Sequence, residues 1–404
     1  MKKKLRVGVI FGGRSGEHEV SLLSAASVLK AIDPARYEVV PIGITKQGLW
    51  VVSNDAERLL TGDFPDAGPS ALRAGDPQHT APAAVLAKGK GVIVPPMPAE
   101  GSGGSLVPFE RPASSLSPAH DVLHLDVVFP VLHGTFGEDG TMQGLFELAG
   151  LAYVGSGVLG SATGMDKEVM KRLFLAAGLP ITRHVTFLRR EWEQSPKKTI
   201  ARIESALKYP LFVKPANLGS SVGISKAHDR KELGPAIDQA AGFDRKIVVE
   251  QAVGGRGNRS RMGKARELEV AVLGNDEPVA SVVGEIVPGK EFYDYEAKYL
   301  SEGSQAIIPA KLTKKQSRQV QAMALDAFRA CDCAGLARVD FLLEAGDSGR
   351  LYLNEINTMP GFTSISMYPK LWEASGMKYR DLISRLIELA LERKAEQEQI
   401  SYSR

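Results

Sequence analysis

The sequence has few cysteines and no long hydrophobic run. Its two cysteines, Cys331 and Cys333, are too close together for a comfortable disulfide and lack the spacing of a zinc site or a redox pair. We expect both to be reduced packing residues of a cytoplasmic protein. The apolar run after the basic start "MKKKLRVGVIF" is too short for a signal peptide. No stretch approaches the roughly 18 apolar residues that a membrane helix needs, so a membrane protein is not expected.

The sequence also lacks an excess of charge of one sign. Its formal net charge is +3, which does not suggest a nucleic-acid partner. Hydrophobic residues make up 44% and charged residues 24% of the 404 residues, which is typical of a globular protein. A chain of this length is expected to divide into two or three domains.

The order of predicted elements indicates an α/β architecture. Residues 5–11 form an apolar strand, a helix follows, and further strands are predicted at 37–45 and 126–134. Strand, helix and strand in this order predict a doubly wound α/β unit. Two stretches rich in glycine, proline and serine, 64–78 and 97–118, are interpreted as surface loops.

Two further regions follow this unit. The second is predicted to contain a helix over 163–178 and strands at 211–215 and 246–251. The third contains a hairpin over 338–361 and an amphipathic helix over 379–394, whose apolar face carries Leu382, Leu386 and Leu389.

Three short motifs match known patterns without their required context. "GSGVLG" at 155–160 fits a dinucleotide fingerprint, but no acidic residue ends a second strand about 20 positions later. "GSSVG" at 219–223 fits the elbow of serine hydrolases, but no helix follows it. "RMGKA" at 261–265 lacks the glycine spacing and the hydroxyl residue of a phosphate-binding P-loop. We interpret the first as a strand-to-helix turn and reject the other two.

The hairpin carries oxygen-bearing side chains that a buried strand normally avoids. If Leu351 pairs with Glu344, Glu355 lies opposite Asp340, and Asn357 shares the face of Glu355. Such a cluster is costly to bury unless a positive group lies among it. Mg²⁺ prefers oxygen ligands of this kind, so the pattern favours a metal site.

Two lysines and a glycine-rich turn suggest a phosphate-binding surface. Lys214 ends an apolar strand just before the turn that contains Gly219, Ser220 and Ser221, whose small residues let backbone N–H groups approach an anion. Lys167 lies in the first turn of a predicted helix, where a cation opposes the helix dipole. For Lys214, a solvated lysine at a strand end remains the alternative.

The segment "FYDYEAKYL" at 292–300 combines aromatic rings, acids and a lysine. This composition suits a loop that orders over a ligand, and an ordinary polar surface loop remains the alternative.

Seven blocks of the sequence, in order, together resemble the D-alanine–D-alanine ligase family of the ATP-grasp superfamily. The blocks are "GGRSGEHEVS", "HGTFGEDGTMQG", "MDKEVMKRLF", "VKPANLGSSVGISK", "FYDYEAKYL", "ARVDF" and "NEINTMPGFTSISMYP". The resemblance implies an α/β protein, α+β in its ATP-grasp part, with an ATP-grasp fold preceded by a Rossmann-like domain. It implies a Rossmann-like domain over 1–154, a central ATP-grasp subdomain over 155–250 and a C-terminal ATP-grasp subdomain with the metal site over 251–404.

The resemblance also implies roles for individual residues. Two Mg²⁺ ions, replaceable by Mn²⁺, would be held by Asp340, Glu355 and Asn357. ATP would be bound by Lys167, Lys214, Ser221, Glu250, Gln251, Val253, Glu267 and Lys298. D-Alanine would be bound by Glu17, His133, Lys298, Arg338, Gly361 and Ser366. Ser220 and Tyr299 would link Glu17 to the loop at 292–300, which would close over the ligand. Arg338 and the Gly361 N–H would stabilise the oxyanion of the tetrahedral intermediate. Helix-start electrostatics remains an alternative for Glu17, as does a structural role for His133.

The resemblance implies an enzyme that uses ATP to join two D-alanine molecules through an acyl phosphate. This reaction would supply a peptidoglycan precursor in the cytoplasm of a bacterium. The resemblance also implies a homodimer. A ligase that uses D-lactate, another ATP-grasp ligase, a nicotinamide-dependent oxidoreductase and a non-catalytic nucleotide-binding protein remain alternatives. Tyr299 within "EAKY" favours the dipeptide product over the ester.

One stretch departs from the family pattern. Between Glu250 and Glu267, where the family has a short link, the chain has "QAVGGRGNRSRMGKAR", an apparent insertion of roughly ten residues that we expect to be a surface excursion.

Deletion of residues 254–264 should therefore leave the chemistry intact, because surface insertions cost little closure entropy. The KM for ATP should stay near the wild-type value in a steady-state assay. A large increase would mean that the insertion helps to bind the nucleotide, and would weaken the assignments of Gln251 and Val253.

Overall fold

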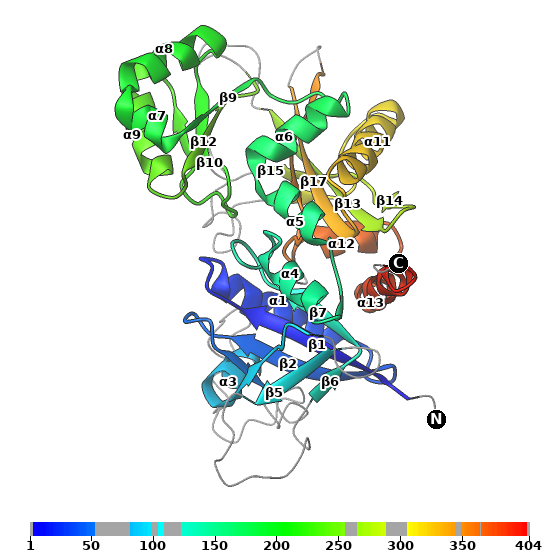
Figure 1. Cartoon of the computed structure of the whole chain (residues 1–404). Coiled ribbons are helices and arrows are strands. Elements are labelled where there is room, and N and C mark those ends of the chain that lie inside the picture. Colours follow the sequence, from blue (N-terminus) through cyan, green and yellow to red (C-terminus); the bar gives the residue numbers. More distant parts are fainter. Residues whose placement is uncertain are drawn as a thin grey trace, which may run out of the picture.

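The protein is built on three β-sheets, which form three lobes in Figure 1. The computed structural model describes residues 3–52, 81–97, 104–108, 123–254, 265–287, 305–344, 349–363 and 365–401. The predicted α/β class is confirmed, since helices accompany all three sheets. The exact domain boundaries stay a prediction.

The first sheet has the strand order β6-β5-β4-β3-β2-β1-β7-β8. The strands β2, β1, β7 and β8 run parallel, as the doubly wound pattern predicts, and the remaining pairs are antiparallel. The bounds are β1 (Leu5–Gly12), β2 (Tyr37–Ile44), β3 (Trp50–Val52), β4 (Lys90–Ile93), β5 (Gly104–Pro108), β6 (Leu123–Leu125), β7 (Val127–Val131) and β8 (Ala152–Tyr153). Its helices are α1 (His18–Ala31), α3 (Ala81–Lys88) and α4 (Thr141–Leu148).

One predicted loop is wrong. The interpretation of 97–118 as a surface loop fails at β5, where Leu106 is buried in the sheet. The flanking glycines and prolines concealed the short alternating run of this strand. The other predicted loop, 64–78, lies outside the described residues.

The second sheet is antiparallel, with the order β11-β10-β12-β9. Its strands are β9 (His184–Leu188), β10 (Leu211–Pro215), β11 (Ser225–Ala227) and β12 (Lys246–Gln251), covered by α7 (Arg189–Gln194), α8 (Pro196–Ala206) and α9 (Arg230–Ala241). The strands predicted at 211–215 and 246–251 are confirmed and pair directly.

The third sheet has the order β16-β15-β13-β17-β18, with β14 paired to β13. Its strands are β13 (Arg266–Gly274), β14 (Val279–Ala280), β15 (Gly284–Val287), β16 (Gln305–Ile307), β17 (Gly335–Leu343) and β18 (Leu351–Asn357). The helices α11 (Lys314–Ala330) and α12 (Met367–Ala374) accompany it. Cys331 and Cys333 follow α11, and both are free and buried, as expected.

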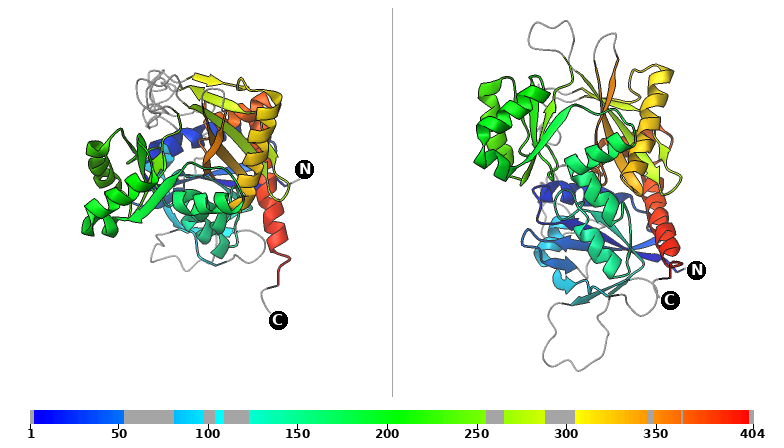
Figure 2. Two further views of the ribbon diagram at one scale, coloured as in Figure 1. Left: turned by 90° about the horizontal axis from the view of Figure 1, so that it is seen from above. Right: turned by 45° about the horizontal axis from the view of Figure 1, so that its top comes forward.

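The predicted helix over 163–178 is two helices, α5 (Val158–Met165) and α6 (Lys167–Ala176). The break falls at Asp166, whose carboxylate accepts hydrogen bonds from the N–H groups of Glu168 and Val169 and so caps α6. Met170 and Phe174 on α6 pack into the core of the third sheet. In the right-hand view of Figure 2, α5 and α6 lie between the lobe of the second sheet and the lobe of the third sheet.

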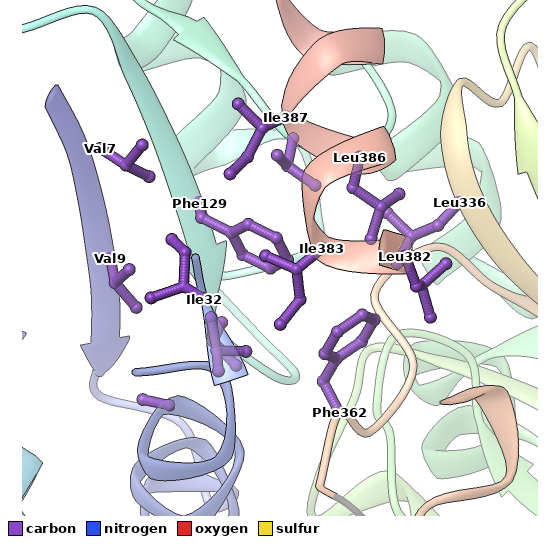
Figure 3. Close-up of a cluster of buried hydrophobic side chains, with 14 of the residues drawn as sticks. Val7, Val9, Ile32, Phe129, Leu336, Phe362, Leu382, Ile383, Leu386 and Ile387 are labelled. Atoms are coloured by element: carbon purple, nitrogen blue, oxygen red, sulfur yellow. The ribbon is translucent and has the colours of Figure 1, made fainter. Parts of the chain in front are cut away.

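The C-terminal helix α13 (Tyr379–Gln397) joins the first sheet to the third. Figure 3 shows Leu382, Ile383, Leu386 and Ile387 between Phe129 on one side and Leu336 on the other. This confirms the predicted apolar face of the helix and ties the end of the chain to its beginning. Within the described residues, no helix combines the length and apolar character required to span a membrane.

Candidate active site

The hairpin of β17 and β18 places Asp340 opposite Glu355, as predicted. The register used to reach that pairing is wrong near the turn, because Leu351 pairs with Leu343 rather than with Glu344. The register shifts between Asp340 and Phe341, leaving Asn354 as the additional residue on β18. This β-bulge moves the pairing by one residue and brings the two carboxylates opposite each other.

Asp340 and Asn357 are in direct contact, since the Asn357 Nδ2 donates to Asp340 Oδ2 at 3.1 Å. Arg338 also binds Asp340, with Nε 2.7 Å from Oδ1 and Nη2 2.6 Å from Oδ2. Its Nε lies 3.2 Å from Glu269 Oε2. Burial alone lowers the pKa of Arg338, but the carboxylates of Asp340 and Glu269 outweigh it, so this pKa is raised.

The donor set of the hairpin fits Mg²⁺, because two carboxylates and an amide oxygen are hard ligands. Across the part of the chain that the structure describes, no three His, Cys, Asp or Glu side chains gather as a metal site. The third donor would therefore be Asn357, with its amide turned so that the oxygen faces the ion. Arg338 is the protein cation that competes for Asp340.

One cavity brings Lys167 and the glycine-rich turn, both predicted to bind phosphate, to this hairpin; Lys214 does not line it. Its lining includes Lys167, Ser220, Ser221, Glu355 and Asn357. The Lys167 Nζ donates to the carbonyl of Leu218 at 2.6 Å, which fixes the ammonium beside the turn. Ser220 and Ser221 adopt left-handed φ values of 48° and 60°, so this turn is held in a conformation that side chains rarely adopt.

Lys214 has the buried anion that its apolar surroundings require, and that anion is Glu250. The Lys214 Nζ lies 2.9 Å from Glu250 Oε2, and a second lysine, Lys171, lies 3.0 Å from Oε1. The solvated-lysine alternative is therefore wrong. Burial raises the pKa of Glu250, but the two lysines outweigh it and hold this pKa well below its usual range.

Glu17 joins the first lobe to the glycine-rich turn. The Ser220 hydroxyl donates to Glu17 Oε1. A Cβ atom at Gly134 would lie 2.5 Å from Glu17 Oε2, and one at Gly219 would lie 2.8 Å from it. Glu17 precedes α1 but makes no side-chain capping hydrogen bond; its carboxylate is engaged by the Ser220 hydroxyl instead.

His133 is buried against the loop that follows β18. Its Nδ1 lies 3.0 Å from the carbonyl oxygen of Met359, and its Nε2 lies 3.1 Å from Ser24 Oγ. The Phe362 N–H donates to the same Ser24 Oγ at 3.3 Å. Burial lowers the pKa of His133, which favours the neutral ring. This arrangement fixes the loop that contains Gly361.

Ser366 precedes α12 and lies near the same loop. Its Oγ accepts from the Thr363 N–H at 3.1 Å and lies 2.8 Å from Thr363 Oγ1. It makes no capping hydrogen bond to α12, so its hydroxyl is engaged by Thr363 rather than by the start of that helix.

Three of the predicted nucleotide-binding residues, Gln251, Val253 and Glu267, do not line this cavity. Gln251 Oε1 accepts the Lys208 N–H at 3.0 Å. Val253 follows β12, and Glu267 pairs along β13 with Ile286 and Leu342. Lys298 and Tyr299 lie outside the described residues, as does most of the insertion.

Two residues of the site were missed from the sequence. Lys171 follows Lys167 by four positions, and this helical spacing was the available signal. Glu138 lies in the "HGTFGEDG" block, lines the cavity, and accepts the Gly134 N–H at 2.8 Å. Burial, together with the nearby carboxylate of Glu17, raises the pKa of Glu138 to about 8.

Two family models match the chain. The model described as D-ala D-ala ligase N-terminus matches residues 6–156, and the model described as D-ala D-ala ligase C-terminus matches residues 173–388.

Curated relatives and solved structures agree with these models and confirm the predicted ATP-grasp fold preceded by a Rossmann-like domain. The D-alanine–D-alanine ligase of Chloroherpeton thalassium is 48% identical over 98% of this chain and 98% of its own. That of Geobacillus thermodenitrificans is 46% identical over 99% of both chains. The structure of the D-alanine–D-alanine ligase from Coxiella burnetii superposes with a TM-score of 0.76 at 32% identity, covering 98% of this chain and 96% of that one. The VanG D-Ala:D-Ser ligase from Enterococcus faecalis gives 0.76 at 34%, covering 96% and 100%.

The raised pKa of Glu138 predicts a pH-dependent stability. Its carboxyl ionises near its ordinary value of 4.5 when unfolded and at about 8 when folded. Between these values the folded state holds the extra proton, so wild-type stability should fall as pH rises through this window. E138Q does not titrate there and should lose less stability.

Urea unfolding of both proteins at pH 5 and pH 8 tests this. E193Q, at an exposed ion pair on α7, is the matched control and should follow the wild type. Parallel pH profiles for the wild type and E138Q would contradict the prediction.

Proposed function

The chain belongs to the D-alanine–D-alanine ligase family, and we propose that it joins two D-alanine molecules through an acyl phosphate. Members of this family are ATP-dependent ligases of peptidoglycan precursor synthesis, and this chain shares that activity. The observation that supports the proposed chemistry is the cavity where Lys167 and the Ser220–Ser221 turn meet Glu355 and Asn357.

The first step activates a carboxylate. The carboxylate oxygen of the first D-alanine attacks the γ-phosphorus of ATP, the bond to the bridging oxygen breaks, and ADP leaves. This gives the carbonyl carbon a phosphate leaving group in place of oxide. The amine of the second D-alanine then attacks that carbon, loses a proton, and phosphate departs as the amide forms.

The chain's residues would stabilise the charge that develops. In the tetrahedral intermediate, the former carbonyl oxygen would lie between Arg338 and the Gly361 N–H. Arg338 is partly buried and held by Asp340 and Glu269, so its guanidinium is already oriented. The loop carrying Gly361 is fixed through His133 and Ser24.

The metal ions would be held by Asp340, Glu355 and Asn357. The family uses ATP and Mg²⁺; we propose two Mg²⁺ ions, which Mn²⁺ can replace. When bound, they neutralise charge on the transferring phosphate. Three lysines would bind the phosphates: Lys167, which lines the cavity, Lys214, which is held by Glu250, and Lys298.

The amino-acid groups would be recognised at opposite ends of the site. Glu17, held by Ser220, would receive the ammonium of the first D-alanine, with neutral His133 and Glu138 beside it. Ser366, just before α12, would receive the carboxylate of the second. Tyr299 would connect the closing loop to Ser220.

The nucleotide base and ribose would lie at the end of β12. Gln251 and Val253 would border the adenine, Glu267 would reach the ribose, and Ser221 would contribute to the phosphate turn. Glu250 lies on β12 directly before Gln251, and its carboxylate is already paired with two lysines. We also propose a homodimer in the cytoplasm, where ATP is supplied.

Phosphate release with ATP, Mg²⁺ and D-alanine tests the function. One ADP and one phosphate should form for each D-alanyl-D-alanine, measured by coupled assay and mass spectrometry. D-serine and D-lactate in competition test the alternatives, since a relative of similar TM-score is a D-Ala:D-Ser ligase. Turnover with D-serine or D-lactate but not D-alanine would overturn the substrate assignment, and no turnover with any of these would overturn the ligase.

Asp340→Asn tests the metal assignment. It should lower kcat at least about 100-fold and raise the Mg²⁺ concentration needed for half-maximal rate, because an ionic ligand is lost. D326N, at an exposed ion pair on α11, is the control. A fall in kcat with an unchanged Mg²⁺ requirement would mean that Asp340 serves only to hold Arg338.

A further inference from the structure

Lys171 is a buried lysine that the proposed chemistry does not use. Its side chain is 1% exposed, in the middle of α6. Lysine is almost never buried this completely unless it is paired, since removing an ammonium from water is costly. The contacts of Lys171 must therefore compensate for the cost of removing its ammonium from water.

Those contacts join three elements. The Lys171 Nζ lies 3.0 Å from Glu250 Oε1 on β12, and it donates to the carbonyl of Asn354 on β18 at 3.4 Å. Asn354 is the additional residue of the β-bulge and directly precedes Glu355. Lys171 therefore connects β12 of the second sheet to β18, the strand that carries the proposed metal ligands Glu355 and Asn357.

Glu250 is shared between two lysines, one on each carboxylate oxygen. With both present, each oxygen has its own ammonium, and Lys214 is held on one side of the carboxylate only. The Lys171 contact supplies Oε1 with a counter-charge, although Oε1 has no hydrogen-bond partner among the described residues. Without Lys171 this buried oxygen would lose that counter-charge, and the carboxylate would turn to regain a partner. Lys214 would then move with it.

Resting on the proposed function, we propose that Lys171 is a positioning residue of the nucleotide site: it sets Lys214 through Glu250 and sets Glu355 through the Asn354 carbonyl. It acts on the phosphates only through these partners. Its loss should weaken the binding of MgATP and leave the recognition of D-alanine, which depends on Glu17 and Ser366, nearly unchanged.

A purely structural lysine predicts a different result. Removing it would lower the free energy of unfolding, but the folded fraction would bind ATP and D-alanine as the wild type does. The separation of the two KM values therefore distinguishes the two roles.

The test compares K171M, which keeps the length and removes the charge, with K171R, which keeps the charge. R172M is the matched control, because Arg172 is the next cation on α6, its side chain is 73% exposed, and its partner Glu168 is also paired with Lys246. K171M should raise the KM for ATP at least about tenfold with the KM for D-alanine within about twofold. K171R should recover most of the loss, and R172M should match the wild type.

Calorimetric binding of MgADP, without D-alanine, supplies a readout independent of ligation. Weaker binding by K171M alone supports the proposal even if no ligation of D-alanine is found, in which case only the proposed function fails. Equal MgADP binding by K171M and the wild type would overturn the positioning role. Should K171M not fold, K171Q, which keeps a donor for the Asn354 carbonyl, decides with the same two outcomes.

Discussion

A carboxylate buried between two ammonium groups is the interaction on which the site depends. Glu250 is 3% exposed and is held by Lys171 and Lys214. Charges of this kind are tolerated only when geometry and pairing compensate for lost hydration. Because each partner comes from a different element, the pairing fixes how α6, β10 and β12 meet. That meeting point forms one side of the proposed nucleotide site.

The first lobe is connected to this site by close packing around a second carboxylate. Gly134 and Gly219 come from different lobes, and each leaves room that a Cβ would fill beside Glu17. The Ser220 hydroxyl completes the contact. The result is that a substrate group bound at Glu17 and a phosphate bound at the Ser220–Ser221 turn would be adjacent, as transfer of a phosphoryl group to a carboxylate requires.

Much of the fold could be predicted from the sequence because its signals are local. Apolar runs identified β1, β10 and β12, and a helical stripe identified α13. The failures also have local causes. Glycines and prolines concealed β5, and the capping carboxylate of Asp166 divided a predicted helix into α5 and α6. The predicted pairing of Asp340 with Glu355 is confirmed, whereas the predicted register near the turn is wrong because of the bulge at Asn354.

The sequence by itself determined the chemistry of the site: two carboxylates and an amide on one hairpin, lysines beside apolar strands, and a turn of small residues. Residue type and the periods of strands and helices are written directly in the chain. Only the tertiary structure decided which charges meet. That Glu250 partners Lys214, that Lys171 joins them, and that Glu138 lies beside Glu17 depend on residues far apart in sequence. Buried charges take partners wherever folding brings them together, and no local pattern encodes that distance.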